Sequence, residues 1–179
     1  MLAQQQIALQ FAKGEWQKAI IREGFASLKG RARFYYKSYK ESLKRLKKRL
    51  QKQGIPVYVF VHDYANFYLV IGEPWVRLVT KAERLRDEVD KLYSKYVVRL
   101  TMDSELREVV RHSHLSFRFS EIRSATYFLP LDVCDLYCDW LESGGSKEFL
   151  EKATKMVEEA DKKFNTFVRE TGVGLLWLD

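Results

Sequence analysis

The most regular apolar pattern in the chain lies between residues 75 and 96. Apolar side chains recur there at alternating intervals of three and four residues, at Trp75, Leu78, Ala82, Leu85, Val89, Leu92 and Tyr96. This spacing places them along one side of an α-helix, so the pattern predicts a long helix with one buried stripe. Pro74 precedes the stripe and suits the first position of a helix.

Similar but shorter patterns predict three more helices. They cover residues 103–112, 131–142 and 146–171. Ser146 is a suitable N-cap for the last of them. The inward face of that helix is expected to carry Phe149, Ala153, Met156, Ala160, Phe164 and Phe167.

Residues 55–71 are rich in β-branched and aromatic side chains but show no 3.6-residue period. They fit either a pair of buried strands or a fully buried helix, and periodicity alone does not separate the two. The sequence therefore predicts an all-α fold with a compact helical bundle over residues 55–179. A short β-hairpin near residues 56–71 is the alternative left open.

The first 54 residues carry a helical pattern of a different kind. Its narrow apolar seam consists of Tyr36, Tyr39, Leu43, Leu46 and Leu50. Upstream the pattern is interrupted at Gly14, Gly24 and Gly30. Each glycine costs a helix interior about 1 kcal/mol, so these three predict bends. Gly54 and Pro56 end the segment, which divides the chain into a basic helical arm over 1–54 and a packing domain over 55–179.

Charge divides the chain at the same place. Residues 1–54 hold fourteen of the 31 Lys and Arg but three of the 24 acids, a local net of +11. The other 125 residues hold the remaining 17 basic and 21 acidic side chains, a net of −4. Such asymmetry indicates an arm for a polyanion, and nucleic acid fits better than a membrane because the apolar stripes are narrow. The candidate nucleic-acid-binding residues are Lys13, Lys18, Arg22, Lys29, Arg31, Arg33, Lys37, Lys40, Lys44, Arg45, Lys47, Lys48, Arg49 and Lys52.

Composition adds limits on class and source. With 179 residues, 46% of them hydrophobic, the chain is long enough for one core. It contains neither a membrane-length apolar run nor a signal peptide at its start, so we expect a protein of the cytoplasm or one packaged from it. Two Asn beside 31% charged residues favour a hot-environment source.

One short motif points to catalysis. Residues 60–68 (FVHDYANFY) resemble the opening strand of the NYN and PIN family of metal-dependent ribonucleases, with Asp63 and Asn66 matching the polar ends of that strand. Such nucleases need carboxylates at the ends of successive parallel strands to hold Mg²⁺. The downstream pattern is helical instead, so a buried aromatic segment is the simpler interpretation.

Two further groups of residues have simpler explanations than a metal site. The residues with zinc-ligand chemistry are His112, His114, Cys134 and Cys138. Their spacing matches no zinc motif, so surface histidines and half-buried cysteines are expected. An acidic stripe consists of Asp132, Asp135 and Asp139. It fits a solvated face or a partner for Lys and Arg of a neighbouring subunit. With no phosphate loop or catalytic triad, we expect no enzyme, no metal and no cofactor.

The layout of the whole chain, a bent basic helical arm before a compact helical domain, resembles the major coat proteins of rod-shaped and filamentous viruses of hyperthermophilic archaea. The resemblance implies arms that wrap linear double-stranded DNA in the A form and packing domains that form a helical shell. It implies a virion assembled in the host cytoplasm and self-association, with a second, related coat protein as a heterodimer partner. It also implies contact with a lipid envelope through the tail around Trp177.

Two other function classes stay open. A cellular or plasmid-borne, chromatin-like protein would bind DNA as a dimer through the 75–96 seam, in the cytoplasm or nucleoid. An NYN-like nuclease would cleave RNA with Mg²⁺ at Asp63. Because no helix-turn-helix, zinc finger or similar reading element is visible, the sequence favours binding to the nucleic-acid backbone without sequence preference.

Overall fold

The computed structural model describes residues 44–61 and 67–174. This part of the chain is an all-α fold with one two-stranded antiparallel sheet. Residues 44–52 are helical. The elements that follow are β1 (Val57–Val61), β2 (Phe67–Ile71), α4 (Trp75–Met102), α5 (Ser104–Arg111), α6 (Leu115–Tyr127), α7 (Leu129–Glu142) and α8 (Lys147–Thr171). The predicted fold class is confirmed, and the segment that the sequence left open is a β-hairpin.

α4 is the helix that the 75–96 pattern predicts, and it continues for six residues beyond that pattern, to Met102. Every residue of the predicted stripe belongs to the core or, for Leu92, packs against it while partly buried. Pro74 occupies the N-cap position just before the helix and is not its first residue. The stripe therefore determines which face of α4 is buried.

A corner of side-chain hydrogen bonds joins α4 to α5. The carboxylate of Asp103 accepts from the backbone N of Leu106 at 2.9 Å and so caps α5. Arg107 donates to the backbone carbonyls of Leu100 and Thr101 at 2.8 and 2.9 Å. These carbonyls lie in the last turn of α4, where the helix itself offers no donor. The corner thus ends one helix and starts the next.

α6 is the helix that the sequence pattern did not predict. Leu115, Phe117 and Phe119 alternate with polar residues at period two, which is typical of a strand. In the structure Phe119 is fully buried while Phe117 is 64% exposed. Phe119 packs against Tyr93 and Phe167, with ring centroids 5.1 and 5.0 Å away. Packing against neighbouring helices therefore stabilises α6 where its own pattern is weak.

α6 and α7 follow one another with a single-residue break. Phe128 is both the C-cap of α6 and the N-cap of α7. Pro130 stands in the first turn of α7, where it cannot donate a hydrogen bond to the preceding helix. The break therefore follows from the sequence at Phe128–Pro130.

A tight turn connects α7 to α8. Gly144 and Gly145 have φ angles of 75° and 96°, a region that favours glycine. Ser146 occupies the predicted N-cap position of α8, but its side chain makes no capping hydrogen bond. Its backbone N donates to Ser143 Oγ at 3.0 Å. The six residues predicted to face inward on α8 all belong to the core or pack against it.

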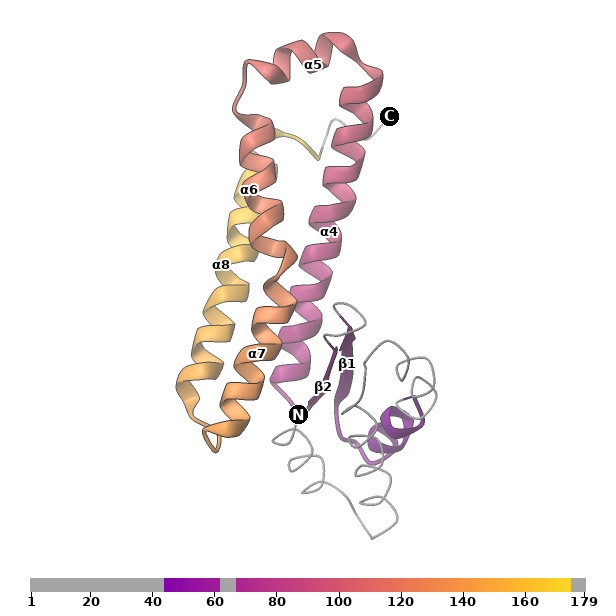
Figure 1. The fold of residues 1–179 in the computed structure, drawn as a ribbon, viewed down its shortest axis with the longest axis vertical. Coiled ribbons are helices and arrows are strands. Elements are labelled where there is room, and N and C mark those ends of the chain that lie inside the picture. Colours follow the sequence, from indigo (N-terminus) through magenta and orange to yellow (C-terminus); the bar gives the residue numbers. More distant parts are fainter. Residues whose placement is uncertain (1–43, 62–66, 175–179) are drawn as a thin grey trace.

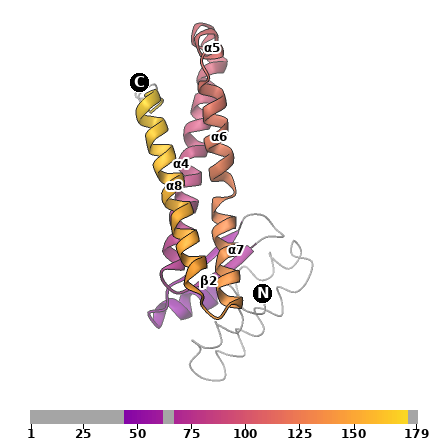
Figure 2. The ribbon, with the colours of Figure 1, turned by 90° about the vertical axis from the view of Figure 1, so that its left-hand side faces the viewer.

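Figure 1 shows how these helices form a bundle of three rows. α4 is the first row, α6 continued by α7 is the second, α8 is the third, and α5 crosses at one end. Each row contacts the other two, and the hairpin packs against α4 and α7 at the opposite end from α5. The turned view in Figure 2 shows α8 running alongside the other two rows. Among the described helices, none is both long and apolar enough to cross a bilayer.

The hairpin is buried on both of its faces. Its register pairs Val57 with Ile71 and Tyr58 with Val70. Val70 is fully buried on the face shared with Tyr58, while Val57 and Ile71 are buried on the opposite face. A strand that is buried on both faces does not alternate apolar and polar residues. This explains why residues 55–71 showed no period in the sequence.

Candidate nucleic-acid interface

The described part of the predicted basic arm is the helix over residues 44–52. Its buried side is apolar, with Leu46 and Leu50 only 4% and 3% exposed. Its exposed side carries Lys44, Arg45, Lys48 and Lys52, while Lys47 and Arg49 are half-buried. These nine residues include six basic side chains and no acid. The helix therefore presents a continuous cationic surface.

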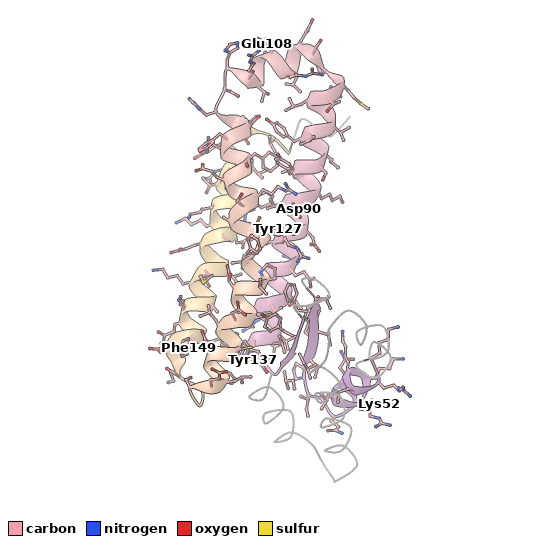
Figure 3. The ribbon with its side chains drawn as sticks, in the orientation of Figure 1. Lys52, Asp90, Glu108, Tyr127, Tyr137 and Phe149 are labelled. Atoms are coloured by element: carbon pink, nitrogen blue, oxygen red, sulfur yellow. The ribbon has the colours of Figure 1, made fainter. Side chains whose placement is uncertain are left out.

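The helix lies beside the hairpin. The Lys47 ammonium is 5.4 Å from the centroid of the Tyr58 ring in β1, a cation–π contact. The backbone N of Ile55 donates to the carbonyl of Leu50 at 3.0 Å and closes the helix end. Figure 3 places Lys52 on the side of this helix turned away from the bundle. Leu46 and Leu50 thus fix the helix so that its basic side faces outward.

Three tyrosine hydroxyls hold the hairpin to the bundle. Tyr58 donates to the Glu83 carboxylate, and Tyr68 donates to Asp135 Oδ1 at 2.6 Å. The third hydroxyl, that of Tyr137 in α7, is discussed below. Burial, together with the hydrogen bond to a carboxylate, raises the pKa of both Tyr58 and Tyr68 well above the usual tyrosine range. Both hydroxyls therefore stay protonated and keep donating at neutral pH.

Tyr137 links α7 to the end of β2. The backbone N of Ile71 donates to the Tyr137 hydroxyl at 3.1 Å. The same hydroxyl donates to the Ile71 carbonyl at 3.4 Å. Burial raises the pKa of Tyr137 to about 12. Its ring also packs against Trp75 with a centroid distance of 5.5 Å. The basic helix is thereby connected to the core through the hairpin.

Six of the fourteen predicted binding residues, those from Lys44 to Lys52, lie in the described part of the chain. The other predicted binding residues lie outside it: Lys13, Lys18, Arg22, Lys29, Arg31, Arg33, Lys37 and Lys40. Tyr36, Tyr39 and Leu43 of the predicted seam and Trp177 of the tail also lie outside the described residues. The six described residues share one short helix, as the sequence predicted.

The nuclease and zinc hypotheses receive no support from the described residues. Asp63 and Asn66 lie outside them, and the strands on either side pair antiparallel, whereas the nuclease family needs parallel strands. His112 and His114 lie at the α5–α6 corner, far along the bundle from the two cysteines of α7. Within the described ranges, no group of three His, Cys, Asp or Glu is arranged to hold a metal ion.

A groove of about 830 Å³ between α6 and α8 is a poor polyanion site. Its charged lining has both signs, with Arg118, Lys162 and Lys163 near Glu121 and Glu159. Four apolar side chains and two threonines line the rest of it. Because opposite charges cancel there, the groove offers a polyanion no strong positive field.

Sequence reasoning missed a second basic surface on the outward face of α4. Its members recur at intervals of seven and four residues: Arg77, Arg84, Lys91, Lys95 and Arg99. All five are exposed. Their spacing places them on the side of the helix opposite the buried stripe, so the same heptad pattern could have revealed them.

No family model, curated protein or solved structure matches this chain.

Proposed function

We propose that this protein is a structural nucleoprotein, a viral major coat protein that packages linear double-stranded DNA in a helical filament. The observation that carries the proposal is the helix over residues 44–52. It has six basic side chains and no acid, and its apolar residues Leu46 and Leu50 are buried. A helix so cationic is electrostatically unfavourable alone and is stabilised by a polyanion.

The charge density of this helix matches that of duplex DNA. Nine residues span about 13 Å of helix at about 1.5 Å per residue. A duplex carries one negative charge per about 1.7 Å, hence about eight over the same length. Six positive charges from a helix lying along the duplex would neutralise most of them. Such matching works through phosphates, which are the same at every base pair, so binding is independent of sequence.

The remaining basic residues of the arm and the resemblance in layout support packaging over transient binding. Eight further Lys and Arg precede residue 44, which brings the arm to a net of +11. On this proposal, copies coat the duplex continuously in a virion, with self-association and a second, related coat protein completing the shell. The tail around Trp177 would contact a lipid envelope where one is present.

The chromatin-like alternative loses its expected dimer surface. The 75–96 stripe is buried within the subunit's own bundle, where Leu78, Ala82 and Val89 belong to the core. A dimer would need a different surface. Electron microscopy of the protein assembled with linear duplex DNA distinguishes the two classes, because a coat protein gives filaments and a chromatin-like dimer gives discrete complexes.

The test of the interface is the salt dependence of duplex binding by the full chain. If about 8 phosphates are neutralised, log K falls against log salt with a slope of about −7. Replacing Lys44, Arg45, Lys48 and Lys52 with Gln removes four contacts and is expected to bring the slope to between about −3 and −4. The matched control replaces four exposed lysines of α8 with Gln: Lys147, Lys152, Lys162 and Lys163.

The control loses the same charge but is expected to change the slope by less than about one unit. Equal effects of the two variants would show that only net charge matters and would reject the interface. A shallow slope for the unmodified chain, or strong preference for one sequence, would reject the proposed function itself.

A further inference from the structure

The outward face of α4, with its five basic residues from Arg77 to Arg99, is largely without partners. Arg84 Nε lies 3.4 Å from Glu88 Oε1. Within residues 44–61 and 67–174, the side chains of Arg77, Lys91, Lys95 and Arg99 make no ion pair or hydrogen bond. Counting Asp87 and Glu88, which are exposed on the same side of the helix, against the five bases leaves this face with a net of +3. We call it the basic α4 face.

The outward face of α7 has the opposite charge. It carries Asp132, Asp135, Asp139 and Glu142, all exposed, at intervals of three, four and three residues. No basic residue occurs from residue 129 to residue 146. This acidic α7 face therefore has a net of −4, opposite in sign to the basic α4 face.

The α7 carboxylates have few cations near them within the subunit. Burial and the charge of Asp135 raise the pKa of Asp132, as expected for neighbouring carboxylates without a cation between them. Within the described residues, the one hydrogen bond from another element to this stripe is that from the Tyr68 hydroxyl to Asp135, at 2.6 Å. This donor is neutral and leaves the net charge of the face unchanged.

We propose that the basic α4 face of one copy docks against the acidic α7 face of a second copy of this chain. The two faces cannot meet within one copy, because each points away from the core that α4 and α7 share. The contact joins two different surfaces, so it is head-to-tail and builds an open helical array unless the rotation closes a ring. It thereby deepens the proposed function, on which it rests, by naming the surfaces that join neighbouring subunits.

The lengths of the two faces are compatible. Arg77 to Arg99 spans 22 residues, or about 33 Å, and Asp132 to Glu142 spans ten residues, or about 15 Å, at about 1.5 Å per residue. The acidic face therefore covers about half of the basic one.

The body as a whole carries a net of −4, which repels a polyanion. Charge complementarity thus favours a second copy over DNA as the occupant of the α4 face.

Such a contact is weak between free subunits. Exposed ion pairs contribute little individually and are screened by salt. Subunits bound side by side on one duplex meet at high effective concentration, so the same contact then becomes effective. We therefore expect weak association without DNA, and cooperative coating of long duplexes with DNA.

Charge reversal of each face tests the inference with the full chain. One variant is R77E/K91E/K95E, the second is D132K/D139K/E142K, and the third combines all six changes and keeps the net charge of the natural chain. Sedimentation velocity at low salt measures association without DNA. Titration of a long random-sequence duplex measures cooperativity, and a duplex short enough for one copy measures intrinsic affinity.

Each single-face variant is expected to weaken association and cooperativity at least tenfold, and the combined variant is expected to restore both. The natural chain and the combined variant should bind the short duplex with affinities that differ less than threefold. Association that is the same in all four proteins would overturn the proposal. Loss of short-duplex affinity in R77E/K91E/K95E without rescue in the combined variant would overturn it in favour of DNA on the α4 face.

The same experiment separates this inference from the proposed function. If the chain binds no duplex but its association without DNA still follows the charge-swap pattern, the docking inference stands and the DNA-packaging proposal fails. If the chain binds DNA but association ignores the swaps, the packaging proposal stands and the docking inference fails.

Discussion

Buried tyrosine hydroxyls connect the small sheet to the bundle in this protein. Tyr137 is the most enclosed of them, and it both accepts from the Ile71 N–H and lies within donating distance of the Ile71 carbonyl. A buried backbone N–H that loses its partner costs about 1–3 kcal/mol. The sequence marked 131–142 as a helix, but it could not show that Tyr137 caps a strand 66 residues earlier in the chain. Long-range hydrogen bonds of this kind leave no periodic signal.

Tyr137→Phe is expected to lower the free energy of unfolding by about 1–3 kcal/mol, because Ile71 N–H is left buried without an acceptor. Chemical denaturation followed by circular dichroism measures this. Tyr93→Phe is the matched control, since the Tyr93 ring packs on Phe119 and its hydroxyl makes no hydrogen bond among the described residues. The control should cost less than about 0.5 kcal/mol. Similar losses in both variants would contradict the role assigned to the Tyr137 hydroxyl.

The pKa of Tyr137 also predicts how stability depends on alkaline pH. Its folded-state pKa is raised from 10.0 to about 12, chiefly by burial. The protonated form is therefore favoured by folding, and its contribution is fully present below about pH 10 and is lost as the pH rises toward 12. Unfolding free energy measured from pH 9 upward should fall across this window. A smaller fall in Tyr137→Phe than in the natural chain is expected, and an identical fall would contradict the assignment.

Among the elements, the sequence predicted the helices that bury one face, left the hairpin as one of two alternatives, and did not predict α6. α4 and α8 each bury a single stripe, so their patterns predicted both the helices and their inward residues. The hairpin is buried on both faces, so its sequence does not alternate apolar and polar residues. In α6 the apolar residues alternate as they would in a strand, and Phe117 is exposed although it is apolar. The basic helix over 44–52 was visible from Leu46, Leu50 and the surrounding charge. Its position beside the hairpin was not, because the contact between Lys47 and Tyr58 leaves no periodic signal in the sequence.

Leu46→Ala with Leu50→Ala is expected to release the basic helix from the hairpin. Truncating a buried leucine costs about 2–5 kcal/mol in a well-packed core. Amide hydrogen exchange without DNA should therefore speed up at least tenfold over residues 44–52, while the amides of α4 and α8 keep their protection. Lys48→Ala, on the exposed side of the same helix, is the control and should leave exchange nearly unchanged. Unchanged protection in the double variant would show that other contacts hold the helix.

At the scale of the whole molecule, charge is arranged in three zones. The arm carries a net of +11, and the body carries a basic α4 face and an acidic α7 face of opposite charge. Under the proposed function, the arm neutralises DNA while the two faces join neighbouring copies. The sequence predicted the first zone, because its charges are contiguous in the chain. It also showed the acidic stripe of Asp132, Asp135 and Asp139, whereas the basic residues of α4 were missed because they are spread over 22 residues among other charges.

The form of the DNA inside an assembled particle is the decisive whole-molecule observation for the packaging proposal. A net of +11 per arm offsets about 19 Å of duplex at one charge per about 1.7 Å. A repeating shell of such arms removes the phosphate repulsion and hydration that help keep DNA in the B form. We therefore expect the enclosed duplex to take the A form, with a rise per base pair clearly shorter than the B-form value of about 3.4 Å. Cryo-electron microscopy of filaments assembled from the full chain and linear duplex measures that rise. B-form DNA lying beside the protein, or filaments without nucleic acid, would contradict the proposal, whereas a shortened rise would show that the protein reshapes the duplex it encloses.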